Sequence, residues 1–363
     1  MYDFRLLFVE DDVQFMDLFQ KDVNEFENDK KCKIDFVKCE NLNEAFEVLD
    51  NSFDGAIIDL RLDTQGDGDE GNKIIEKIRN SRIRIPVAIL TGTPDVTDQD
   101  FSYIDVYIKG RIEYREILNR FWEIRNTGLT NIMGGRGQIE DALYRVFNEK
   151  LMPELNKWIE YGKNEPGLAE KGLLRHVLSY MIQFLDKKDE KYFPEEVYLT
   201  QSGTSVFETG SIVKEKESGH KYIVMTPTCD LVIRSDGKRN TDIVLIAEIE
   251  SHSLLFPGYP YPNLNKADEE KLKKAYGNNK SNYYHWLPET NVFEGGFINF
   301  RKIFSYTIND FISKFDVLNI QISPAFIKDI IARFSFYYAR QGQPEIEYNQ
   351  FLHSSASQMD SMQ

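Results

Sequence analysis

The first 125 residues alternate short apolar runs with segments of helical period, and this pattern restricts the fold more than any other feature. Such alternation predicts parallel strands joined by crossover helices. Five of these units make a doubly wound α/β sheet, whose binding sites lie at the carboxyl ends of the strands. The expected strands cover residues 5–10, 33–39, 55–60, 85–90 and 104–109.

The remaining sequence has a different pattern of apolar residues. A segment with four glycines, 126–137, is typical of a linker. Apolar residues at helical spacing then predict two helices. Short strands separated by Gly, Pro, Asn and Asp predict a small barrel or twisted sheet, with strands expected over 196–200, 211–216, 220–227, 242–249 and 295–300. A last helix is expected over 323–342. We therefore divide the chain into four parts: an α/β domain (1–125), a linker with a helical connector (126–194), a β-rich domain (195–345) and a disordered tail (346–363). The two connector helices are expected over 138–162 and 167–186.

Composition limits the classes of function. The formal net charge of −15 argues against a general affinity for nucleic acid, so DNA is not an expected partner. Three cysteines, at 32, 39 and 229, lack metal-ligand spacing and leave an odd thiol, which fits a reducing compartment. No basic leader and no run of about 18 apolar residues are found, so we expect a cytoplasmic protein without membrane contact.

Acidic residues follow two of the expected strands. Glu10 and Asp11 end the first strand and Asp59 ends the third. Since these strands are neighbours in a doubly wound sheet, the carboxylates would face one crevice and suit Mg²⁺, which prefers oxygen ligands. Thr91 and Lys109 end the fourth and fifth strands and can hold phosphoryl oxygens. A single such acid is commonly a helix cap, but the whole set in order indicates phosphoryl transfer to a carboxylate.

The segment resembles the receiver domain of two-component response regulators, which has a flavodoxin-like fold, in VEDD (9–12), IIDLRL (57–62), ILTGT (89–93) and YIKG (107–110). The resemblance implies that a sensor histidine kinase phosphorylates Asp59. It also implies that Asp11, Asp59 and the backbone carbonyl of Arg61 bind Mg²⁺, with Glu10 acting through water. Thr91 and Lys109 would bind the phosphoryl group.

The sequence departs from the family pattern in three places. Gly110 follows the lysine where the family usually has proline. The aromatic switch position is Val106, and Tyr107 would point to the opposite face of a regular strand. The short segment between Thr91 and Lys109 predicts a shortened or missing fourth helix, which belongs to a surface that many family members use to dimerise.

The β-rich domain offers one further candidate site. Thr228, Cys229 and Asp230 form a polar turn after a strand, and with His285 as base the cysteine would be a nucleophile. The alternative is a structural turn around a buried cysteine, and for His285 aromatic packing within 283–289. The surrounding segment is weakly similar to SH3-like barrels of bacterial toxin and conflict proteins.

Three functions follow. The first is a response regulator whose output acts through protein contacts, because no DNA-binding helix or zinc ligand set occurs after residue 126. The second is a phosphorylation-gated effector enzyme, a nuclease or cysteine hydrolase, that uses the turn at Cys229. The third is a receiver that is never phosphorylated and serves as an assembly platform. Homodimerisation is left open in each.

Overall fold

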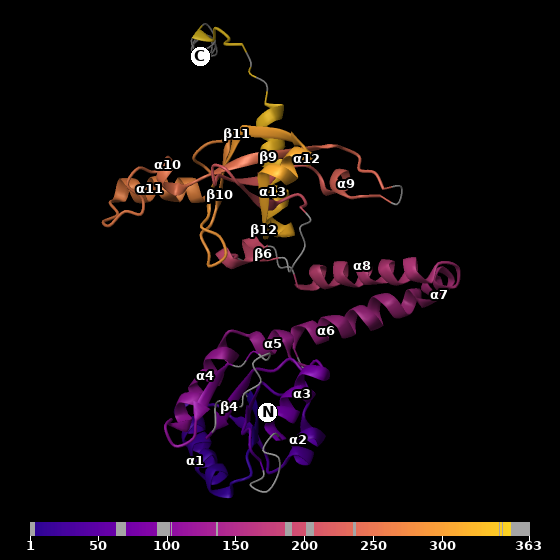
Figure 1. Ribbon diagram of the computed structural model, residues 1–363, viewed down its shortest axis with the longest axis vertical. Coiled ribbons are helices and arrows are strands. Elements are labelled where there is room, and N and C mark those ends of the chain that lie inside the picture. Colours follow the sequence, from indigo (N-terminus) through magenta and orange to yellow (C-terminus); the bar gives the residue numbers. More distant parts are fainter. Residues whose placement is uncertain are drawn as a thin grey trace, which may run out of the picture. The chain divides into compact units, whose positions relative to one another are not determined.

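The chain forms two compact units, Met1–Asp189 and Glu190–Gln363, in the computed structural model (Figure 1). The predicted tail lies outside the described residues from position 350 onward. So do residues 93–101 and 103, on which the prediction of a shortened helix falls. The structure describes residues 4–62, 70–92, 102, 104–135, 137–185, 191–200, 207–234, 237–340, 342 and 344–349.

The N-terminal unit contains the predicted parallel sheet, with strand order β2-β1-β3-β4-β5. This is the order of flavodoxin-like doubly wound folds, so the predicted fold class is confirmed. It makes β1 and β3 neighbours, with Val9 paired to Ile58 at their carboxyl ends. The strands are β1 (Phe4–Val9), β2 (Ile34–Cys39), β3 (Gly55–Ile58), β4 (Val87–Thr91) and β5 (Asp105–Ile108).

Helices cover both faces of this sheet, because alternate residues of each central strand point to opposite faces. On one face Leu7 and Val9 pack with α2 and α3, and on the other Leu6 and Phe8 pack with α1 and α4. The double burial explains why the strands are nearly continuous apolar runs in the sequence. The helices are α1 (Val13–Lys30), α2 (Leu42–Val48), α3 (Glu70–Asn80) and α4 (Tyr114–Asn126).

The glycine-rich segment predicted as a linker is fixed to the N-terminal unit. It forms the short helix α5 (Leu129–Met133). The Gly135 amide donates a hydrogen bond to the Asn51 carbonyl at 2.6 Å, and Arg84 Nε donates to the Met133 carbonyl at 2.8 Å. Arg84 also forms a salt bridge with Glu140. The segment is therefore not a free connection.

Beyond it, the predicted connector helices form an antiparallel hairpin (Figure 1). One arm is α6 (Gln138–Arg145), a π-helical turn (Val146–Leu151), a 3₁₀ turn (Met152–Glu154) and α7 (Leu155–Asn164). The other arm is α8 (Pro166–Leu185). Arg145 lies 4.4 Å from the Phe184 ring centroid, and the rings of Trp158 and His176 are 5.7 Å apart.

In the described part of the chain, no helix is long and apolar enough to cross a membrane.

The C-terminal unit is a curled antiparallel sheet of order β10-β11-β9-β8-β7-β12-β6. The predicted strands at 196–200, 211–216, 220–227, 242–249 and 295–300 are present, while β10 and β12 were missed. β12 was missed because a bulge between Val317 and Ile320 breaks its alternation. The strands are β6 (Tyr198–Thr200), β7 (Ser211–Glu215), β8 (Lys221–Val224), β9 (Ile243–Glu250), β10 (Tyr284–Leu287), β11 (Gly296–Thr307) and β12 (Phe315–Ile322).

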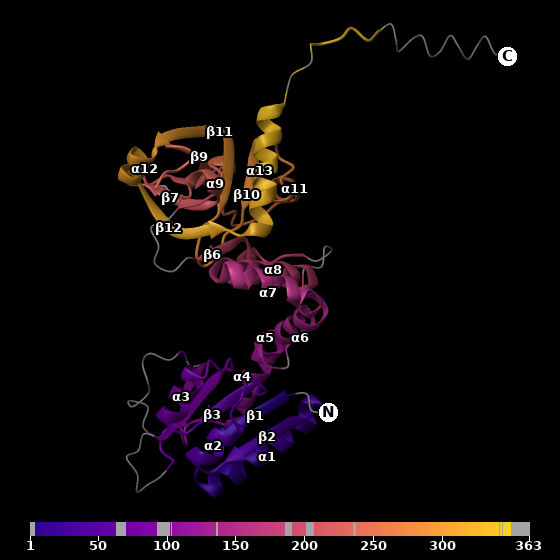
Figure 2. The same cartoon turned by 90° about the vertical axis from the view of Figure 1, so that its right-hand side faces the viewer.

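Each face of this second sheet has its own core. Ile223 and Ile249 belong to the core covered by α13 (Pro324–Ala339), whereas Tyr222 and Val224 belong to the core that includes Phe311 of α12 (Ile308–Lys314). Figure 2 shows α13 and α12 at different sides of the curled sheet. Three further helices are α9 (Thr228–Leu231), α10 (His252–Leu255) and α11 (Lys266–Tyr276).

The attachment of α5 and α6 can be tested at Gly135, because a Cβ there would lie 2.8 Å from the Asn51 Cβ. Gly135→Ala should weaken the attachment by about 1–3 kcal/mol and speed hydrogen exchange in α5 and α6. The matched control is Gly162→Ala in α7, where a Cβ meets nothing within 4 Å. This control should slow exchange in α7, since Ala favours helix over Gly. Unchanged exchange in Gly135→Ala would contradict the attachment.

Candidate functional site

The carboxyl end of β1 carries two acids with different surroundings. Glu10 is fully buried, and its amide donates to the Cys39 carbonyl at 3.0 Å. Asp11 is half-buried. The next residue, Asp12, accepts hydrogen bonds from the amides of Gln14 and Phe15 and caps α1. The sequence motif thus supplies two carboxylates to the crevice and uses the third as a helix cap.

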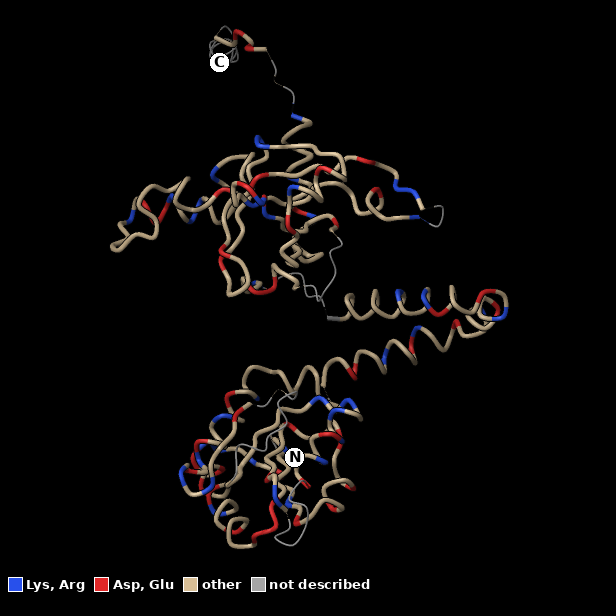
Figure 3. The backbone as a smooth tube through the Cα atoms, viewed as in Figure 1, with Lys and Arg blue, Asp and Glu red and all other residues tan. Residues whose placement is uncertain are grey.

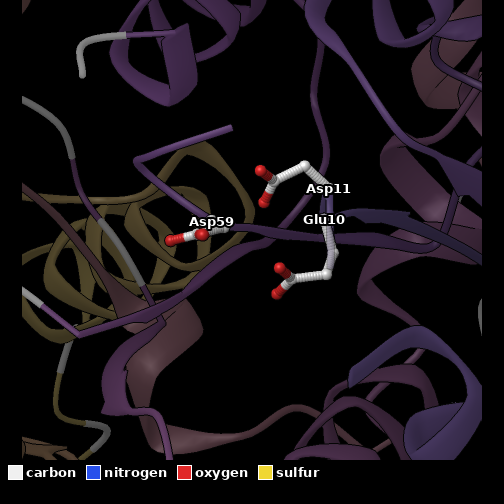
Figure 4. A group of neighbouring side chains, drawn as sticks. All are labelled: Glu10, Asp11 and Asp59. Carbon is white, nitrogen blue, oxygen red and sulfur yellow. The ribbon is translucent and has the colours of Figure 1, made fainter. Parts of the chain in front are cut away.

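Asp59 directly follows β3 and is 4% exposed. Its amide donates to the Val9 carbonyl at 2.9 Å, which fixes it beside the end of β1. Oxygens of Glu10, Asp11 and Asp59 lie within 4.8 Å of one another, and Figure 4 shows the three side chains as neighbours. Gly71 of α3 lies against this strand end, where a Cβ would be 2.4 Å from the Asp59 carbonyl oxygen. Sequence reasoning missed this glycine.

Lys109, directly after β5, joins the carboxylates. Its Nζ donates to Asp59 Oδ2 at 2.8 Å and to Glu10 Oε1 at 2.8 Å. Burial raises the pKa of Glu10 to about 7, although the hydrogen bond from Lys109 opposes this. Burial alone would lower the pKa of Lys109, but the hydrogen bonds to Asp59 and Glu10 outweigh it and raise that pKa. The ammonium therefore stays charged, and it pairs with two of the three acidic side chains of the cluster.

This donor set fits a hard divalent cation. Its ligand atoms are carboxylate oxygens at short mutual distances, and the raised pKa of Glu10 indicates that Lys109 does not fully compensate the buried negative charge. Thr91 ends β4 and is 1% exposed, and its carbonyl accepts from the Lys109 amide at 3.1 Å. Arg61, two residues beyond Asp59, is exposed.

β5 has the side-chain orientation that the sequence predicted. Val106 is exposed, whereas Tyr107 packs against the core shared with α1 and α4. Burial raises the pKa of Tyr107 to about 12. No aromatic side chain therefore occupies position 106 on the face where the family usually carries its switch residue. Gly110, after Lys109, has a φ of 75°, a left-handed conformation that glycine adopts without strain.

In the C-terminal unit, the turn at Cys229 is held by local hydrogen bonds. Thr228 Oγ1 accepts from the Thr209 amide at 3.3 Å, and Asp230 Oδ1 accepts from Asn240 Nδ2 at 3.2 Å. Cys229 itself is exposed, with its Sγ 3.8 Å from Asp230 Oδ1. The prediction that this cysteine is buried is therefore wrong. Thr228 and Asp230 do fix the turn through hydrogen bonds, as the structural alternative expected.

The structure separates His285 from Cys229. His285 lies on β10, three strand positions from β8 in the sheet, which corresponds to about 14 Å. The neighbouring Leu287 belongs to the core under α13, and His285, two residues earlier, shares its face. The helix of Cys229 instead packs through Leu231 into the core on the opposite face. The predicted nucleophile and base are not assembled, because the sheet lies between them.

Comparisons with known proteins give likeness of structure only. Neither any protein-family model nor any curated protein matches the chain. Among solved structures, a CheY-like response regulator receiver domain protein from Methanospirillum hungatei JF-1 is 22% identical over 34% of this chain and 98% of its own, with a TM-score of 0.27. A two-component response regulator from Legionella pneumophila is 18% identical over 34% and 99%, with a TM-score of 0.28. The side chains of the site, rather than these likenesses, carry the functional proposal.

The fit to a cation predicts a specific response to Mg²⁺. At ten times its dissociation constant, Mg²⁺ should stabilise the N-terminal unit by about 1.4 kcal/mol, seen as a rise in its thermal midpoint. Asp11→Asn and Asp59→Asn should lose most of this rise, because each removes a carboxylate of the cluster. Asp12→Asn is the matched control and should keep it, since asparagine also caps a helix. An equal response in all four proteins would contradict the site.

Proposed function

We propose that this chain is a cytoplasmic response regulator of a two-component phosphorelay, with Asp59 as phosphoryl acceptor. The observation that carries the proposal is the meeting of Glu10, Asp11, Asp59 and Lys109 at the carboxyl ends of β1, β3 and β5. A nearly buried carboxylate within reach of a charged ammonium and of further carboxylates is an arrangement for a nucleophile that works beside a cation. The strand order supplies the crevice in which this occurs.

The chemistry assigns a role to each side chain. An Asp59 oxygen attacks the phosphorus of a phosphohistidine on a sensor histidine kinase, so that a P–O bond forms while the P–N bond breaks and the imidazole leaves. Asp11, Asp59 and the Arg61 carbonyl would hold Mg²⁺, with Glu10 acting through water, and the ion would offset the charge of the phosphoryl oxygens. Lys109 and the Thr91 hydroxyl hold those oxygens. The resulting acyl phosphate shifts a pre-existing equilibrium of the receiver.

The apolar surface of the hairpin supports an output through protein contacts. His176, Tyr180 and Phe184 of α8 face the other arm, whereas Leu174, Leu178 and Ile182 are exposed at four-residue intervals. Figure 3 shows that most of α8 is neither acidic nor basic. A helix that is apolar on most sides is normally buried. Other exposed apolar side chains of the hairpin are Leu143, Tyr144, Phe147, Leu155, Ile159 and Leu168.

A second copy of the chain is the occupant that fits this surface. At roughly 80 Å² per half-exposed side chain, the set offers on the order of 700 Å², close to the ~800 Å² that each partner of a standard interface buries. Two copies that bury these side chains against each other would bring their α8 helices together in an assembly of helical hairpins. The same side chains on each copy also satisfy the self-complementarity that two-fold symmetry requires.

The two other functions receive less support. The hypothesis of an effector enzyme is weakened because its proposed base, His285, and nucleophile, Cys229, lie on different faces of the sheet. An assembly platform needs only the apolar hairpin and no phosphoryl transfer, so the acceptor chemistry decides between it and the response regulator.

Phosphorylation can be read directly by mass. Incubation of the protein with Mg²⁺ and acetyl phosphate should add one phosphoryl group to the wild type and to Asp12→Asn. Asp59→Asn should add none, because an amide oxygen is a poor nucleophile. Removal of Mg²⁺ with a chelator should suppress the adduct in the wild type. No adduct on the wild type would discard the acceptor role and favour the platform.

Self-association tests the hairpin surface. Sedimentation over a range of concentrations should show a reversible dimer for the wild type. Leu178→Lys should weaken it at least tenfold, since each dimer would bury two ammonium groups. Gln183→Lys, also on α8 and exposed, adds the same charge off the apolar stripe and should dimerise normally. A monomeric wild type would assign the surface to a different protein, and a dimeric Leu178→Lys would place the interface elsewhere.

A further inference from the structure

A pocket of about 310 Å³ lies in the C-terminal unit between β10, the first turns of α13 and the segment before β6. Figure 2 shows β10 and α13 side by side. The pocket lies wholly within one unit and far along the chain from the carboxylates at the parallel sheet. Its walls are mainly apolar and include several aromatic side chains, and its polar side chains include a histidine and an aspartate: Tyr192, Phe193, Trp286, Phe326, His285 and Asp329.

In this pocket, His285 has a buried ring nitrogen without a hydrogen-bond partner. The side chain is 7% exposed, and its Nδ1 makes no hydrogen bond with any described residue. The nearest acidic oxygen, Asp329 Oδ2, is 3.7 Å away, beyond hydrogen-bonding distance. Burial, and then the positive charge of Arg333, lower the pKa of His285 to about 3, so the imidazole is neutral at ordinary pH. A buried polar atom left unpaired in this way costs free energy.

The two polar groups set the chemistry of a ligand. With its proton on Nε2, a neutral imidazole accepts a hydrogen bond at Nδ1, and the Asp329 carboxylate also accepts. Two acceptors 3.7 Å apart are both satisfied by a donor placed between them. The flat apolar side chains around them favour a planar ring, as in most small-molecule pockets, which are largely apolar with few convergent polar groups. The exposed Asp329 and Phe193 mark the open side.

We propose that this pocket binds a small planar aromatic molecule through an N–H donor directed at His285 Nδ1 and Asp329. The ring stacks among the aromatic walls, and the N–H group supplies the hydrogen bond that the buried imidazole lacks. The C-terminal unit then has a ligand site of its own, in addition to the acceptor site of the N-terminal unit. This proposal does not depend on phosphorylation of Asp59.

Two probes of nearly equal size and shape isolate the donor. Indole carries a ring N–H, whereas benzofuran has an oxygen in its place and donates nothing. With the full-length chain, ligand-observed NMR titration should show saturable binding of indole roughly tenfold tighter than that of benzofuran. Equal affinities would overturn the role of the donor, and the absence of saturable binding for both would overturn the site.

Variants then place the binding in this pocket. Asp329→Ala should weaken indole binding about fivefold to tenfold and reduce its preference over benzofuran. The matched control is Asp316→Ala on β12, because the two aspartates have similar exposures of 63% and 64%. His285→Phe keeps a planar ring but removes the acceptor, and should abolish the preference for indole while the C-terminal unit stays folded. An unchanged preference in both pocket variants would refute the assignment.

Discussion

The ion pairs of Lys109 with Glu10 and Asp59 are the interactions on which the N-terminal site depends. Glu10 and Asp59 are almost wholly buried on neighbouring strands, and ionised carboxylates in such positions are tolerated only when paired. Lys109 reaches both from β5, so one side chain relates the ends of β1, β3 and β5. Lys109 leaves the cluster short of positive charge, and this is the observation that favours the proposed cation at the site.

Much of this site could be predicted because local signals agreed with one another. Strands buried on both faces are continuous apolar runs, and their ends are marked by Glu10, Asp59, Thr91 and Lys109. The tight approach of Gly71 to Asp59 could not be predicted, since it depends on where α3 meets the sheet. A glycine near a helix start is by itself compatible with ordinary loop geometry.

The C-terminal unit shows where sequence reasoning fails. β11 continues past Arg301 and Lys302 through a bulge, and Asn319 adopts a left-handed conformation within the bulge of β12, so neither strand alternates regularly. Whether His285 meets Cys229 depends on the face that each occupies, and a shift of one residue in register reverses that face. Residue types alone suggested a catalytic pair, and only the pairing of strands showed that a sheet lies between them.

The attachment of the hairpin has a mechanical consequence. Arg84, which holds Met133 and Glu140, lies at the amino side of β4, and Thr91 forms the carboxyl end of that strand. The strand itself, Val87–Thr91, spans roughly 13 Å at about 3.3 Å per residue, and Arg84 precedes it by three residues. A short stretch of backbone therefore joins the crevice to the base of the hairpin, so that a displacement of β4 along its axis would reach the contacts of Arg84 through only a few residues.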